Sequence, residues 1–224
     1  YPVKLKDINP TGSSVKMSTQ YVEMNGFVYF VADDGVHGRE IWKSDGTDVG
    51  TTLLKDIKVG PGAMSISNNL IVLGNQLLFA AASSYDTELW SSDGTSANTV
   101  MLKDIRPGTS SSNPRPLLVH GGLMYFLAQD SASGTKLWTT DGTQAGTQVL
   151  KDIYPGTSTS SEIVVFNNRI YLNAATAAEG TELWVTDGTA TGSLLVKDIN
   201  TGNNSSNPTN LTVCNGKLYF TAVT

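Results

Sequence analysis

The chain has 224 residues, a formal net charge of −5 and a pI near 4.9. The acidic balance argues against a nucleic-acid partner and against an anionic membrane surface, which both need a basic patch. No apolar run approaches the roughly 20 residues of a membrane-spanning helix. With 16% charged residues and abundant Ser, Thr, Asn and Gly, the composition is typical of secreted proteins, so we expect an extracellular or cell-surface location.

The chain begins with an element that recurs. Residues 3–8, Val-Lys-Leu-Lys-Asp-Ile, are predicted to form a strand. The same ending returns at Lys55-Asp56-Ile57, Lys103-Asp104-Ile105, Lys151-Asp152-Ile153 and Lys197-Asp198-Ile199. The chain has five copies of this ending but only four copies of the tryptophan motif described below, so we expect the sequence to begin in the middle of a repeat.

Each repeat reads as four short strands. A polar loop leads to an apolar run such as 163–166, and a tight Asn/Gly turn such as Asn25-Gly26 follows, which is a strong hairpin signal. A second strand (27–32) ends in a loop of variable sequence (33–38). The third strand carries Trp42, and an Asp-Gly-Thr turn leads into the fourth strand (51–57). No helical period longer than one turn is present.

The motif Trp-x-x-Asp-Gly-Thr sets the period. It recurs at steps of 48, 48 and 46 residues and holds all four tryptophans of the chain. Four antiparallel strands repeated at this spacing predict an all-β chain, a β-propeller of about five four-stranded blades, rather than a β-solenoid, which repeats at shorter periods. We expect one domain over residues 1–224, with repeats at 9–57, 58–105, 106–153 and 154–199, and a closing blade built from both termini, 200–224 and 1–8. The alternative is a segment of a longer array that is complete only with more sequence or with a partner chain.

The repeat resembles a known family. Glu88 through Thr95 and Glu182 through Thr189 are similar to the ELWxxDGT repeat family, and the resemblance covers essentially the whole chain. It implies a large extracellular or surface protein of bacteria, built from propeller blades and mostly without assigned activity. Two copies differ from the family pattern, because Ile41 replaces Leu and Lys136 replaces Glu.

The tryptophan and aspartate of the motif are interpreted as structural. One Trp at the same strand position in each repeat favours packing between blades over a ring of exposed platforms for sugars. Each motif Asp is expected to accept hydrogen bonds from nearby backbone N–H groups. No Asp-x-Asp-x-Asp loop is present, so calcium is only weakly supported and we expect no cofactor. The residues concerned are Trp42, Asp45, Trp90, Asp93, Trp138, Asp141, Trp184 and Asp187.

Two further side-chain patterns give structural expectations. Symmetric pairing about the Asp-Gly-Thr turn would place Glu40 opposite Lys55, with the same pairing at Glu88 and Lys103 and at Glu182 and Lys197. In the third repeat Lys136 would then oppose Lys151, so either the register differs or that blade is weaker. The single cysteine, Cys214, is expected in a strand as a small buried apolar group.

The candidate binding surface is the opposite end of each blade. In an antiparallel blade the loops between second and third strands lie away from the Asp-Gly-Thr turns, and loops on a rigid scaffold commonly carry binding residues. Ordinary solvated loops are the alternative. The candidates are Asp33, Asp34, His37, Tyr85, Asp86 and Asp130. His37 and His120 fall in different loop classes, which disfavours a catalytic or metal-binding histidine pair.

Three functions remain open on the sequence alone. The first is a non-catalytic binding or adhesion module, lectin-like, with a glycan or surface polymer as partner. The second is a structural repeat subunit of a larger extracellular fibre or surface assembly, which implies self-association. An enzyme is the least favoured, because no Gly-x-Ser-x-Gly, phosphate-loop or His-Glu-x-x-His motif is present, and Asp33-Asp34 are adjacent in an extended chain and so point to opposite sides.

Overall fold

The computed structural model describes residues 4–15, 19–59, 69–83, 86–131, 134–151, 153–155 and 162–224. Within these ranges the chain forms β-strands and no helix, so the prediction of an all-β chain is confirmed. Accordingly, the described ranges offer no helix that could cross a membrane. The chain divides into two compact units, Tyr1–Pro116 with Gly142–Gln144 and Leu117–Asp141 with Ala145–Thr224.

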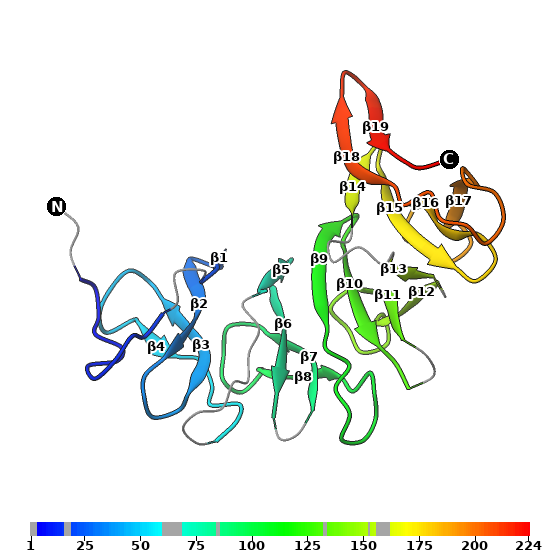
Figure 1. Ribbon diagram of the computed structural model, residues 1–224. Helices are drawn as coiled ribbons and strands as arrows, with labels where there is room; N and C mark the ends of the chain where they lie inside the picture. The colour runs from blue at the N-terminus through cyan, green and yellow to red at the C-terminus, as the bar shows by residue number, and fades with distance from the viewer. Residues whose placement is uncertain are drawn as a thin grey trace. The chain divides into compact units, whose positions relative to one another are not determined.

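The first unit contains two four-stranded antiparallel sheets (Figure 1). The first sheet has the strand order β1 (Tyr21–Met24), β2 (Phe27–Asp33), β3 (Arg39–Ser44) and β4 (Thr52–Leu53). The second has the order β5 (Ile71–Leu73), β6 (Gln76–Ala82), β7 (Thr87–Ser92) and β8 (Val100–Lys103). Each strand pairs with the next along the chain, as the repeat predicts.

The second unit repeats the pattern. The third sheet consists of β9 (Arg115–His120), β10 (Leu123–Gln129), β11 (Thr135–Thr140) and β12 (Gln148–Lys151). The fourth consists of β14 (Ile163–Phe166), β15 (Arg169–Thr176), β16 (Gly180–Thr186) and β17 (Leu194–Lys197), with the short β13 (Tyr154–Pro155) also paired to β15. A hairpin of β18 (Thr209–Cys214) and β19 (Lys217–Thr221) follows. Each sheet falls inside one predicted repeat.

Turn residues explain where the strands reverse. Asn25 and Gly26 both have positive φ, at 54° and 78°, which matches the twist of a two-residue hairpin. Gly46 of the Asp-Gly-Thr turn has φ of 90°, and its counterparts in the other three motifs lie between 90° and 95°. Such values favour glycine, so the repeated Gly follows from backbone geometry.

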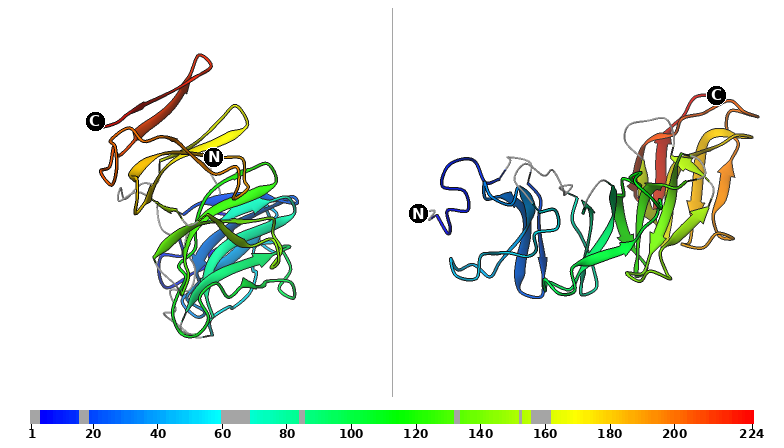
Figure 2. Two further views of the ribbon diagram at one scale, coloured as in Figure 1. Left: turned by 90° about the vertical axis from the view of Figure 1, so that its right-hand side faces the viewer. Right: turned by 90° about the horizontal axis from the view of Figure 1, so that it is seen from below.

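Within each unit the two sheets pack against each other through a shared apolar core. In the first unit Tyr29, Val31 and Ile41 of the first sheet pack against Phe79 and Trp90 of the second. In the second unit one cluster joins the third and fourth sheets in the same way. Figure 2 shows the first two sheets, in blue and blue-green, lying side by side. The four tryptophans are only 6–8% exposed, so their predicted packing role is confirmed.

The predicted N-terminal strand is wrong for the residues that the structure describes. Residues 4–8 lie in no strand. Their lysines bond elsewhere, because Lys4 pairs with Asp7 and Lys6 donates to the carbonyl oxygen of Asp48 at 2.9 Å. Ile8 nevertheless packs on the cluster that contains Phe30. The hairpin β18–β19 is a two-stranded sheet within the second unit.

The environment of Cys214 also differs from expectation. It ends strand β18, as predicted, but its side chain is exposed. Only two strands make this sheet, and most residues of both are exposed. A thiol at this position therefore has no core to enter.

Candidate functional site

The Asp-Gly-Thr turn uses its own carboxylate. Asp45 Oδ1 accepts hydrogen bonds from the backbone N–H of Thr47 at 2.9 Å and from its hydroxyl at 2.7 Å. Asp93 and Asp187 bind Thr95 and Thr189 at the same two distances. The threonine hydroxyl and backbone bonds lower the pKa of all three carboxyls. The predicted structural role of the motif aspartate is therefore confirmed at these positions.

A pair of hydroxyl groups closes the same turn in all four sheets. Each pair joins the end of the third strand to the start of the fourth across 2.7 Å, and each is buried. The pairs are Ser44 with Thr51, Ser92 with Thr99, Thr140 with Thr147 and Thr186 with Ser193. This end of each sheet thus satisfies its polar groups internally.

The same turns join one sheet to the next. A Cβ added at Gly94 would overlap the hydroxyl of Tyr29 from the preceding sheet, and Tyr125 stands against Gly188 in the second unit in the same way. Burial, and next the negative charge of Asp93 or Asp187, raises the pKa of these two tyrosines. Only Gly can let the ring approach so closely, which gives a second reason for glycine in the motif.

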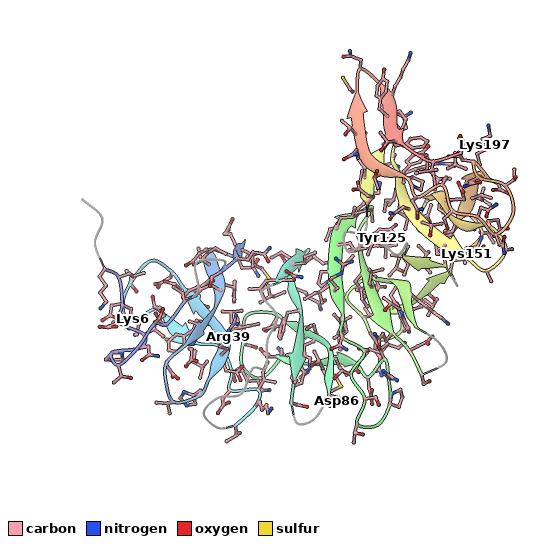
Figure 3. All side chains as sticks on the ribbon, viewed as in Figure 1. Lys6, Arg39, Asp86, Tyr125, Lys151 and Lys197 are labelled. Carbon is pink, nitrogen blue, oxygen red and sulfur yellow. The ribbon has the colours of Figure 1, made fainter. Side chains whose placement is uncertain are left out.

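Three of the lysines in the Lys-Asp-Ile endings provide a second link. Lys55 Nζ donates to the carbonyl oxygen of Thr99 at 2.7 Å, and Lys151 donates to that of Ser193. Lys6 reaches the first turn through Asp48 (Figure 3). Lys151 also lies 5.2 Å from the ring centroid of Trp184, a cation–π distance. We name this end of each sheet the fastening end.

The predicted pairing of glutamate with lysine is wrong in the second and fourth sheets. Lys103 lies opposite Leu89 instead of Glu88, because a bulge between Leu89 and Trp90 shifts the register by one residue. The same shift places Lys197 opposite Leu183. In the third sheet Lys151 lies opposite Leu137. Of the two alternatives for Lys136, a different register or a weaker blade, the structure therefore shows the different register.

The glutamate instead holds the connection to the next sheet. Glu88 accepts hydrogen bonds from the backbone N–H of Ile105 at 2.8 Å and of Ser112 at 2.9 Å, and from the Ser112 hydroxyl at 2.6 Å. Glu182 binds Ile199 and Ser206 in the same manner. Both carboxylates are fully buried. Burial raises the pKa of Glu88 although these bonds oppose the shift.

The opposite end of each sheet, where the second strand connects to the third, is called the loop end. In the first sheet Asp33 Oδ1 accepts from Gly35 N–H at 2.8 Å. Asp34 accepts from the N–H groups of Val36 and His37, and its second oxygen lies 2.7 Å from His37 Nδ1. The hydrogen bond to Asp34 is the main cause of the raised pKa of His37. Burial acts to raise the pKa of Asp34, but the hydrogen bonds from His37 and Val36 outweigh it, so the pKa of Asp34 is lowered.

The loop ends of the next two sheets carry other charged groups. Asp86, Glu88 and Asp104 place one carboxylate oxygen each within 4.8 Å of one another. In the third sheet Asp130 Oδ2 lies 3.0 Å from Lys136 Nζ, and both side chains are largely buried. Lys136 is therefore paired with an acid from the neighbouring loop, and the like-charge contact does not arise.

The structure thus places most of the predicted candidates. Asp33, Asp34 and His37 share one loop, Asp86 lies at the second loop end (Figure 3), and Asp130 lies at the third. Tyr85 lies outside the described residues. Sequence reasoning missed Glu88 and Asp104 as neighbours of Asp86, because they converge only through the pairing of β7 with β8. It also missed Tyr29 and Tyr125, although Tyr recurs at that position of the second strand.

Neither models of known protein families nor curated protein sequences match this chain. Among solved structures it is similar to a mutant puromycin hydrolase, with a TM-score of 0.53 and 14% identity over 90% of this chain. TolB from Acinetobacter baumannii has a TM-score of 0.44 and 14% identity, and the match covers 77% of this chain and 41% of that one. The chain spans 32% of the length of the puromycin hydrolase. At these identities the comparison bears on fold alone.

Proposed function

We propose that this chain is a non-catalytic binding module of the ELWxxDGT repeat type. In this proposal the sheets are blades of an extracellular or cell-surface propeller of about five blades, and the loop ends bind a glycan or a surface polymer. The observation that carries it is the contrast between the two ends. Polar groups at the fastening end bond within the fold in the same way in successive sheets, whereas charged groups at the loop ends differ from sheet to sheet.

The chemistry of the loop ends supports binding more than catalysis. Within the described ranges, the ring of His37 is hydrogen-bonded to Asp34 and to no hydroxyl or thiol, so a nucleophile–base pair is not assembled there. Asp33 caps its own turn through Gly35. Carboxylates, an imidazole and an ammonium group at loop ends are suitable partners for sugar hydroxyls and for charged polymer groups.

A binding screen tests this proposal. The chain would be applied to a panel of glycans and surface polymers, beside the variant His37→Ala and the control Lys217→Ala at the exposed start of β19. We expect a ligand whose binding falls at least several-fold in His37→Ala or in a matching Asp130→Ala variant and persists in the control. Absence of any ligand across the panel, or an equal loss in the control, would contradict the proposal.

A second candidate function is a structural repeat subunit of a larger surface assembly, and the first sheet offers an observation in its favour. A pocket of about 490 Å³ lies on this sheet, with Ile8, Val28, Phe30 and Gly46 in its lining. Among the described residues nothing lies within 4 Å of a Cβ added at Gly46, whereas its counterpart Gly94 receives Tyr29. The pocket thus matches the place where the tyrosine of another blade would enter.

In this candidate the occupant is the hairpin β18–β19 of a second copy of the chain. Tyr219 holds the position of Tyr29 in the repeat and is 53% exposed. The contact would continue the interface that already joins the first and second sheets. Sedimentation of the chain should then show association that rises with concentration and that Tyr219→Ala and Val28→Asp each abolish. A monomer at every concentration would exclude this function.

A further inference from the structure

The pocket on the first sheet lies on a face that a neighbouring sheet covers in the second sheet. Val28 and Tyr21 line this pocket and are 38% and 58% exposed. The equivalent side chains of the second sheet, Leu77 and Leu70, are fully buried because they pack in the core shared with the first sheet. The pocket is therefore the first sheet's version of a packing site that the fold fills at the second sheet.

Lys6 and Ile8 cover one side of this face in the way that a preceding sheet does. Lys6 (Figure 3) donates to the carbonyl oxygen of Asp48. The same contact recurs in the second sheet, where Lys55 donates to the carbonyl oxygen of Ser96 at 3.3 Å. Ile8 packs on the apolar cluster of the first sheet, and both residues line the pocket. They give it a wall, and its volume of about 490 Å³ falls in the range of small-molecule pockets.

Two filled sites show which chemical group enters at this place. In the second and fourth sheets the motif glycine faces the hydroxyl of a tyrosine from the preceding sheet, with Tyr29 at Gly94 and Tyr125 at Gly188. Gly46 is the equivalent glycine of the first sheet, and it lines the pocket. A Cβ added at Gly46 would meet nothing within 4 Å among the described residues. The pocket thus has room where the other two sheets hold a phenol group.

We propose that this pocket binds a small phenol, with its hydroxyl group at Gly46 and its ring against Val28 and Phe30. Apolar side chains form one part of the lining, and Ser44 and Thr51 form a polar part next to Gly46. An aromatic ring with a single polar end matches that division. A fatty chain would leave the polar part without a partner, and a sugar would bring hydroxyl groups onto the apolar part.

The charge at this place suits a neutral hydroxyl group. At the filled site of the second sheet, burial and next the negative charge of Asp93 raise the pKa of Tyr29. Asp45 is the equivalent carboxylate of the first sheet and lines the pocket. A simple phenol, which is neutral at pH 7, therefore fits better than a ligand that carries a negative charge.

Titration with p-cresol, which is the tyrosine side chain by itself, tests the proposal. Amide chemical shifts of the isotope-labelled chain report binding, its location and the folding of each variant. We expect saturable shifts at Gly46 and Val28 with a Kd on the order of 1 mM or tighter. Toluene, which lacks the hydroxyl group, should bind at least several-fold more weakly. No saturable shift up to about 10 mM, or equal affinity for toluene, would overturn the proposal.

Two glycine variants test the position of the hydroxyl group. Gly46→Ala should weaken p-cresol binding several-fold and leave toluene binding unchanged, because the added Cβ takes the place of the hydroxyl. The control is Gly202→Ala, since Gly202 also has a positive φ, 81°, and open space around its Cβ position. It should bind p-cresol as the unmodified chain does. Equal affinity for p-cresol in Gly46→Ala and in the control would overturn the proposal.

The second candidate function uses the same pocket, but phenol binding does not require self-association. The titration is therefore repeated with Tyr219→Ala, which cannot place its own phenol group in the pocket of another copy. We expect Tyr219→Ala to bind p-cresol at least as tightly as the unmodified chain. Loss of binding in this variant would overturn the proposal even if the unmodified chain associates. Binding by a chain that sediments as a monomer would exclude the assembly alone.

Discussion

The two ends of each sheet differ in how their polar groups are used. At the fastening end Asp93 accepts a hydrogen bond from the backbone N–H of Thr95, and the Thr99 hydroxyl donates to the carbonyl oxygen of Thr95. The tyrosine of the preceding sheet packs directly against Gly94. At the loop end the second sheet has three converging acids, whereas the first has an Asp34–His37 pair. The feature that recurs unchanged is therefore explained by packing, and the proposed binding site lies at the end that differs from sheet to sheet.

The largest expected effect is at the fastening end. Trp90→Ala removes a side chain that is 7% exposed and packs with Tyr29 and Phe79. We expect a loss of about 3–5 kcal/mol in the free energy of unfolding, the usual range for an aromatic-to-alanine change in a core. Urea unfolding followed by circular dichroism measures it. A loss below about 1 kcal/mol would mean that the tryptophan is not a packing residue.

The next effect concerns the buried ion pair of the third loop end. Lys136→Met leaves the Asp130 carboxylate without the ammonium group 3.0 Å away. Breaking a buried pair costs roughly 3–5 kcal/mol, and the small exposure of both side chains places the expected loss at the lower end. The double variant Lys136→Met with Asp130→Asn should recover most of the loss in urea unfolding. A double variant as unstable as the single one would show that the pair is not the cause.

A smaller effect is expected where the loop end holds its connection. Ser112→Ala removes the hydroxyl that donates to Glu88 at 2.6 Å, and bonds to charged groups contribute about 1.5–3 kcal/mol. Because the pKa of Glu88 is raised, ionisation of Glu88 destabilises the folded state once the pH exceeds the unfolded pKa. The Ser112 hydroxyl opposes this effect, because it donates to the ionised carboxylate. The loss should therefore be larger at neutral pH than in acid. An equal loss at both pH values would indicate a steric cause.

The smallest effect is the pH dependence of the first loop end. The pKa of His37 is raised, chiefly by the Asp34 bond, with further contributions from the charges of Asp56 and Glu40. The pair therefore contributes stability below the unfolded pKa of about 6.5 and loses it as the pH rises through the folded pKa. Its partial exposure limits the contribution to below about 1 kcal/mol. His37→Asn should lower stability at about pH 5.5 and change little at about pH 8.

Much of the fold follows from the period of Trp-x-x-Asp-Gly-Thr, since strand order, hairpin turns and tryptophan burial could all be read from it. Pairing details could not. The bulge after Leu89 has no marker in the sequence, so the partner of Glu88 was mistaken. Residues 3–8 carry the strand pattern of the other repeats, yet residues 4–8 form no strand. That residues 1–224 form one closed propeller stays a prediction.

The candidate site was predictable only in outline. The sequence indicates the loop ends because Asp33, His37, Asp86 and Asp130 vary from repeat to repeat. It does not reveal that Asp104, 18 residues after Asp86, shares an edge with it. That neighbourhood depends on which residue of β8 lies opposite which residue of β7, and the shifted register decides it.

The most direct measurement compares two glycines of the same motif. Gly46→Ala and Gly94→Ala meet nearly the same backbone strain, with φ of 90° and 93°, which costs about 1–3 kcal/mol. Only Gly94 faces the buried hydroxyl of Tyr29. If the motif fastens one sheet to the next, Gly94→Ala should lose about 1–3 kcal/mol more in urea unfolding than Gly46→Ala. Equal losses would contradict the fastening role.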